Sequence, residues 1–576
     1  MWRFDFAGDA PLIFRDPVRT FVATHPEDVR STLAAAEEAR RDGYWIAGVL
    51  SYEASSGLDY TLVTQPSSDF PLVWMGAFSP PHRHAEHDVI TGPYRIGDWH
   101  ENRLDQAVYR QQIATIRAAI QAGLTYQVNY TVRLKADFTG SPVGWYEDLR
   151  RSQSGDYAAY LDIGRFAVLS ASPELFFRVS GSDIVTRPMK GTAPRGAYTV
   201  TDERYRRALQ QSEKERAENV MIVDLMRNDL GRLAQTGSVK VDALFDVEKY
   251  PTVWQLTSTV RARRPPELTW ADCLATLFPA GSVTGAPKVR TMALIRDREA
   301  SPRGAYCGSL GYVTPDGDAV FNVAIRTAVV DRCEGTASFG TGGGITWDSD
   351  PDAEYRELWA KAAFLDGIGG DFALIETTLL DSGQLALIDY HTDRLKHAVE
   401  YFGWPWYPQR VQAAWSRLKR HHGRWRVRLL YGRDGHVRTT RHPVNRVSGV
   451  QAVAYADRPM PPRDAWTWHK TTRRERYSID ALGHTSVFDY VLFNEDNEIT
   501  EFTRGNLVLE SATGMLQTPP IEAGLLPGTM RQWLLDTGRI HETRITRAEL
   551  EAAQTLWFIN SVYGWVPVRL LEETTD

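Results

Sequence analysis

The spacing of apolar and polar positions changes along the chain between helical and strand periodicity. Three isoleucines share one face of a helix predicted over residues 104–122, and Gly123 closes it. Residues 126–134 alternate as a strand does, and residues 43–53 are apolar enough for a buried strand. As far as residue 345, strands and helices interleave without the regular rhythm of a parallel sheet. We therefore expect an α+β protein.

One predicted hairpin carries a candidate pair of reacting groups. Residues 175–179 are apolar, Gly181-Ser-Asp follows, and Ile184-Val185 resumes the apolar pattern, which indicates strand, turn and strand. This arrangement could bring Glu174 and Lys190 to the same end of a sheet. The Gly-Thr-Ala-Pro-Arg-Gly after the lysine predicts a turn. A lysine whose pKa is lowered by burial could act as a nucleophile beside a carboxylic acid, and a surface ion pair is the other interpretation.

Carboxylates recur on two predicted helices. Glu218 lies in a helix over residues 216–230, and a second helix over residues 350–361 carries Glu354, Glu357 and Lys361 on one face. Such carboxylates could hold Mg²⁺ through one or two oxygens beside a substrate anion. A solvated face of ion pairs would give the same pattern.

Three further segments could bind an anion. The turn over residues 278–288, which contains Thr284 and Gly285, leads into a helix whose N-terminus could hold a small carboxylate. The Walker spacing is absent, which excludes a nucleotide phosphate loop. Arg326 at a strand end could bind a carboxylate through two hydrogen bonds. The glycines 342–344 either let a backbone approach a ligand closely or form a plain tight turn.

Composition argues against several classes of protein, including nucleic-acid-binding, disulfide-rich and membrane-spanning proteins. The 576 residues are 43% hydrophobic and 24% charged, as in globular proteins, and the net charge of −6 gives no basic footprint for nucleic acid. Cys273, Cys307 and Cys333 form no Cys-x-x-Cys pair, so a zinc site or a disulfide framework is not expected. The chain has no run of 18 apolar residues and no apolar signal core, so we expect a cytoplasmic protein without a membrane span.

A glycine-rich stretch divides the chain. Residues 367–371 form a short linker, after which the pattern of strands and helices restarts. We therefore expect one domain over residues 1–366, in which residues 1–100 are the less defined part, and a second domain over residues 372–576.

A series of motifs in the first domain carries a family resemblance. The motifs are Ser-Pro-Glu174, Pro-Met-Lys190-Gly-Thr, Arg-Ala-Glu218-Asn-Val-Met-Ile-Val-Asp-Leu, Gly-Ser-Val-Thr284-Gly-Ala-Pro-Lys, Asn-Val-Ala-Ile-Arg326-Thr, Gly-Gly-Gly344-Ile and Glu354-x-x-Glu357-x-x-x-Lys361. In this order they resemble the chorismate-utilising enzymes, strongly over residues 100–365 and weakly over residues 1–100. The resemblance implies an antiparallel β-sandwich core with flanking helices.

Residues at three places in the sequence discriminate within this family. Anthranilate and isochorismate synthases typically carry a small residue where Lys190 stands. Isochorismate and salicylate synthases carry a lysine base where Gln127 stands, and anthranilate synthases usually have histidines where Trp254-Gln255 stands. The chain is therefore most similar to the aminodeoxychorismate synthase branch, in which the lysine is a nucleophile.

The resemblance also implies a mechanism. Lys190 would attack C2 of chorismate while Glu174 protonates the departing C4 hydroxyl, and ammonia would then add at C4 and expel the lysine. Mg²⁺ would neutralise the ring carboxylate. The implied metal ligands are Glu218 and Glu357, with Glu354 nearby, and the implied substrate-binding residues are Thr284, Gly285, Arg326, Gly342, Gly343, Gly344 and Lys361. The chain has no Gly-x-Cys-x-Gly glutaminase motif, so a separate glutamine amidotransferase subunit is the expected source of ammonia.

A second set of motifs follows the linker. It consists of Ile375-Glu-Thr-Thr, His391-Thr-Asp-Arg394-Leu, His469-Lys470-Thr-Thr, Glu498-Ile-Thr-Glu501-Phe, Gly524-Leu-Leu-Pro-Gly528-Thr-Met-Arg and Phe558-Ile-Asn-Ser561. Each alone has an ordinary structural interpretation. In this order they resemble the fold-type IV pyridoxal-phosphate enzymes, which include branched-chain aminotransferases and 4-amino-4-deoxychorismate lyases. That resemblance implies a domain of two α+β subdomains. It also implies a homodimer through this domain as one possible assembly.

The second resemblance assigns roles for pyridoxal 5′-phosphate. Lys470 would form the Schiff base and move the proton, and Glu501 would pair with the pyridine nitrogen. Arg394, Ser561 and the amides around Thr529 and Met530 would hold the phosphate. The two halves together imply synthesis of 4-aminobenzoate for folate from chorismate, with loss of pyruvate. The alternatives are an aminodeoxychorismate or anthranilate synthase joined to a transaminase, and one joined to a non-catalytic docking module.

Overall fold

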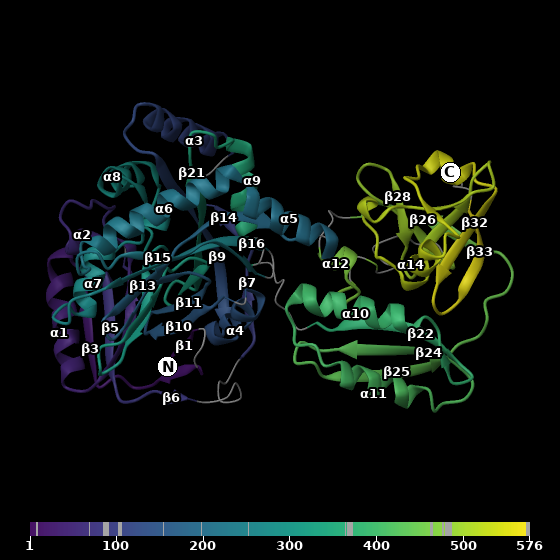
Figure 1. Ribbon diagram of the computed structural model, residues 1–576, viewed down its shortest axis with the longest axis horizontal. Helices are drawn as coiled ribbons and strands as arrows, with labels where there is room; N and C mark the ends of the chain where they lie inside the picture. Colours follow the sequence, from purple (N-terminus) through teal and green to yellow (C-terminus); the bar gives the residue numbers. More distant parts are fainter. Residues whose placement is uncertain are drawn as a thin grey trace. The chain divides into compact units, whose positions relative to one another are not determined.

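The chain folds as two compact units (Figure 1). The computed structural model describes residues 1–576 except 7–9, 68, 84–91, 102–105, 154, 197–198, 251–252, 363–364, 366–371, 461–464, 475–476, 478–486 and 572–576. The predicted linker, residues 367–371, lies outside the described residues. The first unit contains Met1–Arg195 and Arg204–Gly370, and the second contains Gly196–Glu203 and Asp371–Asp576.

Two antiparallel sheets build the first unit. The strands of the first sheet are β1 (Trp2–Phe6), β2 (Leu12–Phe14), β6 (His82–Arg83), β7 (Tyr94–Ile96), β8 (His100–Glu101), β9 (Gln127–Gly140), β10 (Tyr157–Ile163), β11 (Phe166–Ser172), β17 (Gly285–Ala286), β20 (Thr327–Asp331) and β21 (Thr336–Ile345). Their order is β17-β9-β21-β20-β11-β10-β1-β2-β6, with β7 and β8 also paired to β9. The first strand of the chain therefore lies inside a sheet.

The second sheet has the order β14-β16-β13-β12-β19-β18-β4-β5-β3, with β15 paired to β16. Its strands are β3 (Arg19–Ala23), β4 (Trp45–Leu50), β5 (Val73–Phe78), β12 (Leu175–Ser180), β13 (Asp183–Arg187), β14 (Met189–Pro194), β15 (Lys240–Lys249), β16 (Val253–Arg263), β18 (Ser309–Val313) and β19 (Ala319–Asn322). Phe4 and Phe14 of the first sheet share a buried core with Val49 and Tyr312 of the second. The two sheets thus form the expected sandwich.

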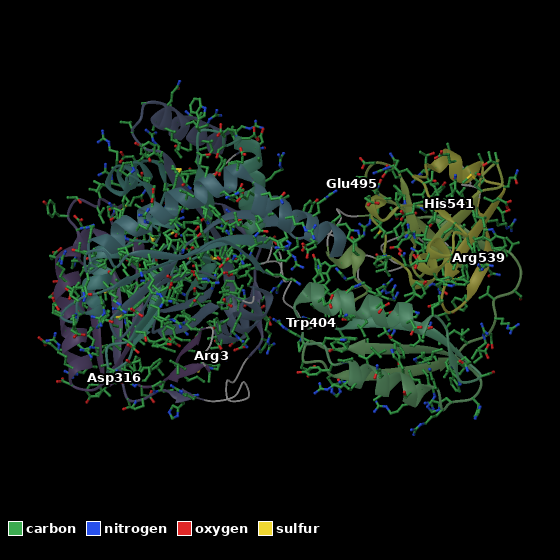
Figure 2. The ribbon with its side chains drawn as sticks, in the orientation of Figure 1. Arg3, Asp316, Trp404, Glu495, Arg539 and His541 are labelled. Carbon is green, nitrogen blue, oxygen red and sulfur yellow. The ribbon has the colours of Figure 1, made fainter. Side chains whose placement is uncertain are left out.

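Helices cover the outer faces of the sandwich (Figure 1). The helices before residue 370 are α1 (Val29–Arg41), α2 (Ser55–Leu58), α3 (Gln106–Gln121), α4 (Pro142–Gln153), α5 (Thr199–Gln211), α6 (Glu213–Gly231), α7 (Trp270–Leu277), α8 (Lys288–Arg298) and α9 (Pro351–Ala362), with 3-10 turns η1 (Pro26–Asp28), η2 (Tyr52–Ala54) and η4 (Gly281–Val283). Arg3 of β1, labelled in Figure 2, pairs with Asp5 at 2.7 Å and with Glu147 of α4 at 2.8 Å. Buried charges therefore fix α4 against the first sheet.

Helix α6 positions several site residues, and its sequence explains where it begins and which face it buries. Ser212 caps its N-terminus by accepting a hydrogen bond from the backbone of Glu215. Ile222, Met226 and Leu230 are buried in the core that covers the second sheet. Glu215 and Glu218 precede these residues at helical spacing on the same face, so the face that packs on the sheet carries carboxylates near its N-terminal end.

The turn predicted after Lys190 is absent, and the tight-turn interpretation of glycines 342–344 is excluded. The residues after Lys190 continue strand β14, since Thr192, Ala193 and Pro194 pair with β16. The glycines 342–344 lie in β21, paired with residues 129–131 of β9, and form no turn. Both segments carry turn-prone residues, but their ladder partners are distant in sequence and outweigh the local preference.

The second unit contains two smaller sheets. The first has the order β23-β22-β24-β25, built from β22 (Leu374–Asp381), β23 (Gln384–Leu385), β24 (Arg424–Tyr431) and β25 (Val437–Pro443). Helices α10 (Ile388–Phe402) and α11 (Pro408–Leu418) pack against it through Val399 and Trp415.

The other sheet of this unit is mixed and has the order β28-β27-β26-β33-β32-β29-β30-β31. Its elements are β26 (Gln451–Tyr455), β27 (Asp489–Phe493), β28 (Ile499–Phe502), β29 (Asn506–Glu510), β30 (Leu516–Thr518), β31 (His541–Glu542), β32 (Thr555–Asn560) and β33 (Gly564–Leu570), with α12 (Ala465–Trp468), η7 (Ile521–Ala523), α14 (Thr529–Asp536) and α15 (Arg547–Glu551). Met530 and Leu534 of α14 pack on Val508 and Ile559 of this sheet. The unit therefore has the two expected α+β subdomains.

Candidate active sites

A cavity of about 240 Å³ in the first unit collects most of the residues that the sequence singled out. Among those residues, the cavity is lined by Glu174, Lys190, Glu218, Arg326, Gly342, Gly343, Gly344, Glu354, Glu357 and Lys361. They come from the ends of strands β14 and β21, from helices α6 and α9 and from the connections between elements. The fold thus brings together side chains that are up to 187 positions apart in the sequence.

Glu174 is a buried carboxyl group on the cavity wall. Burial raises its pKa to about 7, although a hydrogen bond from Ser282 and the charge of Lys190 act in the opposite direction. The Oγ of Ser282 donates to Oε1 of Glu174 at 2.6 Å. A carboxyl group with this pKa can carry a proton near neutral pH and release it, as a general acid does.

Lys190 extends its amine into the same cavity. Its Nζ lies 3.8 Å from Oε2 of Glu218. The backbone around it is fixed by Asn219, whose side chain donates to the carbonyl of Lys190 at 3.1 Å, and by Gln255, which donates to the carbonyl of Gly191 at 2.8 Å. Gly344 gives the amine its space, because a Cβ on that residue would lie 2.2 Å from Nζ.

Two lysines and four carboxyl groups gather at the cavity floor. Lys361 pairs with Glu357 at 2.8 Å and donates to the carbonyl of Gly342 at 2.9 Å, and this ammonium lowers the pKa of Glu357. Burial raises the pKa of Glu354, which accepts a hydrogen bond from Ser349 at 2.7 Å. Glu215, which the sequence analysis missed, lines the cavity three positions before Glu218 on α6.

The donor set at this floor suits a hard divalent cation. Among the described residues no group of three or more His, Cys, Asp or Glu side chains is close enough to hold a metal ion. Mg²⁺, however, needs only one or two carboxylates when water and a substrate anion complete its shell. Glu218 on α6 and Glu357 on α9 provide such oxygens on two sides of the cavity. The residues present therefore fit this ion.

Thr284 and Gly285 do not line the cavity. The hydroxyl of Thr284 donates to the carbonyls of Ala280 and Gly281 at 3.2 Å, and Gly285 pairs with Val128 of β9. Their neighbours Ser282 and Val283 form the cavity wall instead. The motif thus reaches the cavity through residues one and two positions before Thr284, and not through Thr284 or Gly285.

Arg326 lies half-buried at the cavity, between β19 and β20. Its φ of 51° lies in the left-handed region, which a residue other than glycine rarely adopts. Burial lowers its pKa to about 10, and the ring of Tyr250 lies 6.0 Å from the guanidinium. A guanidinium held in this way favours a carboxylate ligand.

A second cavity, of about 140 Å³, lies within the second unit. All of the residues predicted to hold pyridoxal phosphate line it: Arg394, Lys470, Glu501, Thr529, Met530 and Ser561. Burial lowers the pKa of Lys470 to about 7, helped by the charges of Arg474 and Arg394. Burial also raises the pKa of Glu501 to about 7, and Glu501 accepts hydrogen bonds from the backbone of Leu526 and from Tyr477.

A buried polar chain lies behind the predicted phosphate site, and the sequence analysis missed two of its members. Glu376 pairs with Arg394 at 2.6 Å and with Nδ1 of His391 at 2.5 Å. Nε2 of His391 lies 3.0 Å from the hydroxyl of Ser561 and 3.2 Å from that of Thr529. Glu376 and His391 both stand in motifs identified above, Ile375-Glu376 and His391-Thr-Asp-Arg394. The sequence did not show that the two side chains are buried and in contact.

The second cavity fits the cofactor that the sequence implied. Pyridoxal phosphate requires an amine, an acid facing the ring nitrogen and a phosphate site. Lys470, Glu501 and the N-terminus of α14 with Arg394 supply these three chemistries around one cavity.

Comparison with known proteins gives the family. Residues 4–366, more than half of the chain, match the family model described as chorismate binding enzyme. The chain belongs to the chorismate binding enzymes. Residues 373–571 match the model described as amino-transferase class IV. Both resemblances drawn from the sequence are thereby confirmed.

Individual relatives agree with this assignment. The chain is 38% identical over 301 residues to aminodeoxychorismate synthase component 1 of Salmonella typhimurium, which covers 52% of this chain and 64% of that protein. It is 38% identical over 359 residues to aminodeoxychorismate synthase of Streptomyces griseus, which covers 62% of this chain and 46% of that protein. The chain thus spans about half to two thirds of the length of these relatives.

A solved structure shows the same fold for the first unit. Anthranilate synthase component I from Streptococcus pneumoniae aligns with a TM-score of 0.53 at 26% identity and covers 62% of this chain and 91% of that structure. Among the described residues, no helix is both long and apolar enough to span a membrane.

Proposed function

We propose that the first unit aminates chorismate with ammonia to 4-amino-4-deoxychorismate and that the second unit converts this product into 4-aminobenzoate and pyruvate. The observation that carries the first half is one cavity that holds both the amine of Lys190 and the buried acid Glu174. Two relatives named aminodeoxychorismate synthase support the same activity. The whole sequence would supply 4-aminobenzoate for folate.

Lys190 and Glu174 divide the first reaction into two displacements. The amine of Lys190 forms a bond to C2 of the ring, both ring double bonds shift, and the C4 hydroxyl leaves as water with the proton of Glu174. Ammonia then adds at C4, both double bonds shift back, and the bond to Lys190 breaks. Without an amine at this position, ammonia would have to attack C2, which leads to the anthranilate series.

The other residues of this cavity bind the substrate. Arg326 and Lys361 would hold carboxylates of chorismate, and the backbone of glycines 342–344 allows the substrate to approach closely. Glu218 and Glu357, with Glu354 nearby, would hold Mg²⁺, which would neutralise a substrate carboxylate. Ammonia would come from a separate glutamine amidotransferase subunit, and a cytoplasmic location follows from the same proposal.

In the second unit, Lys470 would move the proton. Pyridoxal phosphate, when bound, supplies an electron sink for the bonds that break at the substrate. The amine of Lys470 takes the proton from C4 of the substrate ring, the enolpyruvyl group leaves and becomes pyruvate on protonation, and the ring becomes aromatic. Glu501 would face the ring nitrogen, and Arg394, Ser561 and the amides of Thr529 and Met530 would hold the phosphate.

The charge of the second cavity favours an anionic substrate. Arg426 and Arg428 occupy alternate positions on β24, are exposed, and both line the cavity beside Arg474. Partial desolvation within the cavity lowers the pKa of Arg428, and the positive charges of Arg426 and Arg474 lower it further, as expected where like charges gather. The substrate 4-amino-4-deoxychorismate carries two carboxylates, which would relieve this repulsion.

A product assay tests both halves. Purified protein is incubated with chorismate, Mg²⁺, ammonium and pyridoxal phosphate, and the wild type is compared with Lys190→Ala and Lys470→Ala. We expect 4-aminobenzoate and pyruvate from the wild type and accumulation of aminodeoxychorismate by Lys470→Ala. A wild type that stops at aminodeoxychorismate would make the second unit a transaminase or a docking module. Anthranilate as the product would contradict the role of Lys190.

A further inference from the structure

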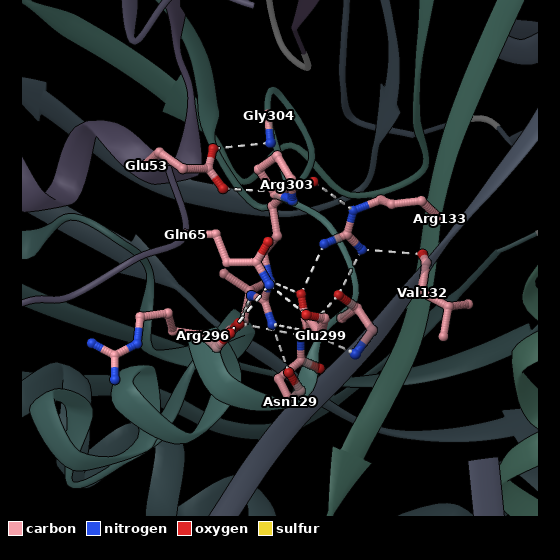
Figure 3. Close-up of polar contacts among 12 residues, drawn as sticks. Glu53, Gln65, Asn129, Val132, Arg133, Arg296, Glu299, Arg303 and Gly304 are labelled. Atoms are coloured by element: carbon pink, nitrogen blue, oxygen red, sulfur yellow. Dashed lines mark hydrogen bonds and ion pairs between the residues drawn. The ribbon is translucent and has the colours of Figure 1, made fainter. Parts of the chain in front are cut away.

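A buried arginine ties two segments of the first cavity wall together (Figure 3). The guanidinium of Arg303 donates to the backbone carbonyl of Val283 at 2.7 Å and to that of Asn129 at 2.7 Å. Val283 and Asn129 both line the cavity, one from η4 and the other from β9. One side chain therefore fixes the separation of two wall segments that are 154 positions apart.

The arginine is itself held from several sides. It donates to both carboxylate oxygens of Glu299, at 3.0 and 2.6 Å, and its own backbone N–H donates to Glu53 at 2.7 Å. Glu299 also accepts two hydrogen bonds from Thr131 of β9 and one from Arg133 at 2.8 Å. Figure 3 shows Glu299 between the two guanidinium groups. Hydrogen bonds to two carboxylates therefore hold Arg303 in place in addition to its packing.

Stability does not account for such a cluster. Glu53, Glu299 and Arg303 are buried and Arg133 is half-buried, and removing such groups from water costs desolvation energy. Well-packed apolar residues of similar volume usually stabilise a fold as well or better. What an arginine adds is directional donors, which apolar residues lack. Two further N–H groups of Arg303 donate to the carbonyls of Val283 and Asn129 on the cavity wall. The cluster therefore fixes the position of that wall.

The wall segment held by Arg303 carries the serine that contacts the acid. Ser282 precedes Val283 in η4, and its hydroxyl donates to Glu174 at 2.6 Å. The carbonyl of Val283 accepts from Arg303 and also from the side chain of Asn129 at 3.1 Å. We propose that Arg303, anchored by Glu299, is a positioning residue for the first reaction, because it fixes η4 so that Ser282 keeps its hydrogen bond to Glu174. The inference rests on the proposed function of that cavity.

The test compares three variants. Arg303→Lys keeps the charge beside Glu299 but removes the forked donors that reach Val283 and Asn129. Ser282→Ala removes the hydrogen bond to Glu174 directly. Because that bond lowers the pKa of Glu174, both variants should move the alkaline limb of the kcat/KM profile to higher pH, by about one unit for a bond to a charged group. Lys190, the charged group that faces Glu174 among the described residues, is unchanged in both.

Arg133→Lys is the matched control. Arg133 shares Glu299 with Arg303, but its other contacts are the carbonyls of Pro302 and Val132, the hydroxyl of Thr131 and the ring of Tyr306. We expect this control to lower the melting temperature without moving the pH profile. In the Ser282→Ala background, Arg303→Lys should cause no further shift of the alkaline limb, and an additional shift would overturn the proposal.

A measurement without turnover separates this inference from the proposed function. Infrared difference spectra between the wild type and Glu174→Gln report the protonation of the Glu174 carboxyl group as pH is varied. If Arg303→Lys raises the midpoint of that titration, the positioning role stands even in a protein that fails to aminate chorismate. An unchanged midpoint, with a melting temperature lowered as in Arg133→Lys, makes Arg303 structural. Should Arg303→Lys not fold, Glu299→Gln is expected to shift the same midpoint in the same direction, and no shift overturns the proposal.

Discussion

Gly344 and Lys190 face each other so closely that a single added carbon on the glycine would occupy the position of the lysine amine. A Cβ on Gly344 would lie 2.2 Å from Nζ of Lys190 and 2.2 Å from the side-chain nitrogen of Gln127. The backbone at Gly344 is an extended strand that any residue can adopt, since its φ is not positive. The glycine is therefore required by the space of the lysine and not by the chain conformation.

Gly344→Ala is expected to displace Lys190 and to reduce amination by at least about a hundredfold, as misplacement of a reacting group by about 1 Å does. Circular dichroism and thermal unfolding should remain near those of the wild type, because the flexible end of the lysine can move away. Gly231→Ala is the matched control, since a Cβ on Gly231 meets nothing within 4 Å. Equal activity in Gly344→Ala and the wild type would contradict the position of the amine.

The pH dependence of amination should report Glu174. The group must be protonated to release the C4 hydroxyl, and its pKa is raised to about 7 by burial. The rate should therefore fall about tenfold for each pH unit above 7. Initial rates with ammonia held at constant free base from pH 6 to 9 measure this limb. Glu174→Gln should lose the limb together with about 10²- to 10⁴-fold in rate, and a limb that survives the substitution belongs to another group.

Capture of pyridoxal phosphate by the second unit should follow the neutral form of Lys470. Burial lowers the pKa of this amine to about 7, so the rate should rise with pH up to about 7 and then level off. Stopped-flow absorbance after apoprotein is mixed with the cofactor measures it. Arg474→Gln removes a neighbouring positive charge that lowers the pKa, so its profile should move to higher pH. A wild-type midpoint near 10, the ordinary range of lysine, would contradict the burial of the amine.

Loss of Glu376 should destabilise the second unit. Its carboxylate, whose pKa is lowered by Arg394 and His391 despite burial, is the buried partner of both groups. Glu376→Ala would leave the half-buried guanidinium of Arg394 and the buried imidazole of His391 without their carboxylate, and is expected to cost about 3 kcal/mol of unfolding free energy. Urea unfolding followed by tryptophan fluorescence measures the loss. The exposed pair of Lys396 and Glu400 on α10 provides the control, since Glu400→Ala should change stability by less than about 1 kcal/mol.

Local patterns predicted the elements well, and the hairpin formed by β12 and β13 lies where alternation and the Gly181 turn placed it. The same reasoning failed for β14 and β21, where glycine, proline and threonine indicate turns. Strand pairing with β16 and β9 decided those segments, and such partners cannot be read from a short window.

For the candidate sites, the sequence likewise predicted some features and not others. The order of the motifs pointed to Lys190, Glu174 and Lys470, because these proposed reacting groups stand in short recognisable motifs. The contacts that tune them remained hidden. Ser282 meets Glu174 across 108 positions and His391 meets Ser561 across 170, so neither contact leaves a local trace. For Thr284 the sequence misleads in the opposite way. Its residue type suggests a substrate contact, but its hydroxyl donates to the nearby carbonyl of Ala280.

The interior place of β1 in its sheet has a consequence for synthesis. Trp2 pairs with Leu161 of β10, so one side of the first strand has no partner until about 160 further residues have left the ribosome. At roughly 5–20 residues per second, that strand waits on the order of ten to thirty seconds. During this time Phe4, Phe6 and Phe14 are unprotected and the open strand edge can pair with another chain. The order of synthesis therefore leaves this edge of β1 open to pairing with another chain until β10 has been made.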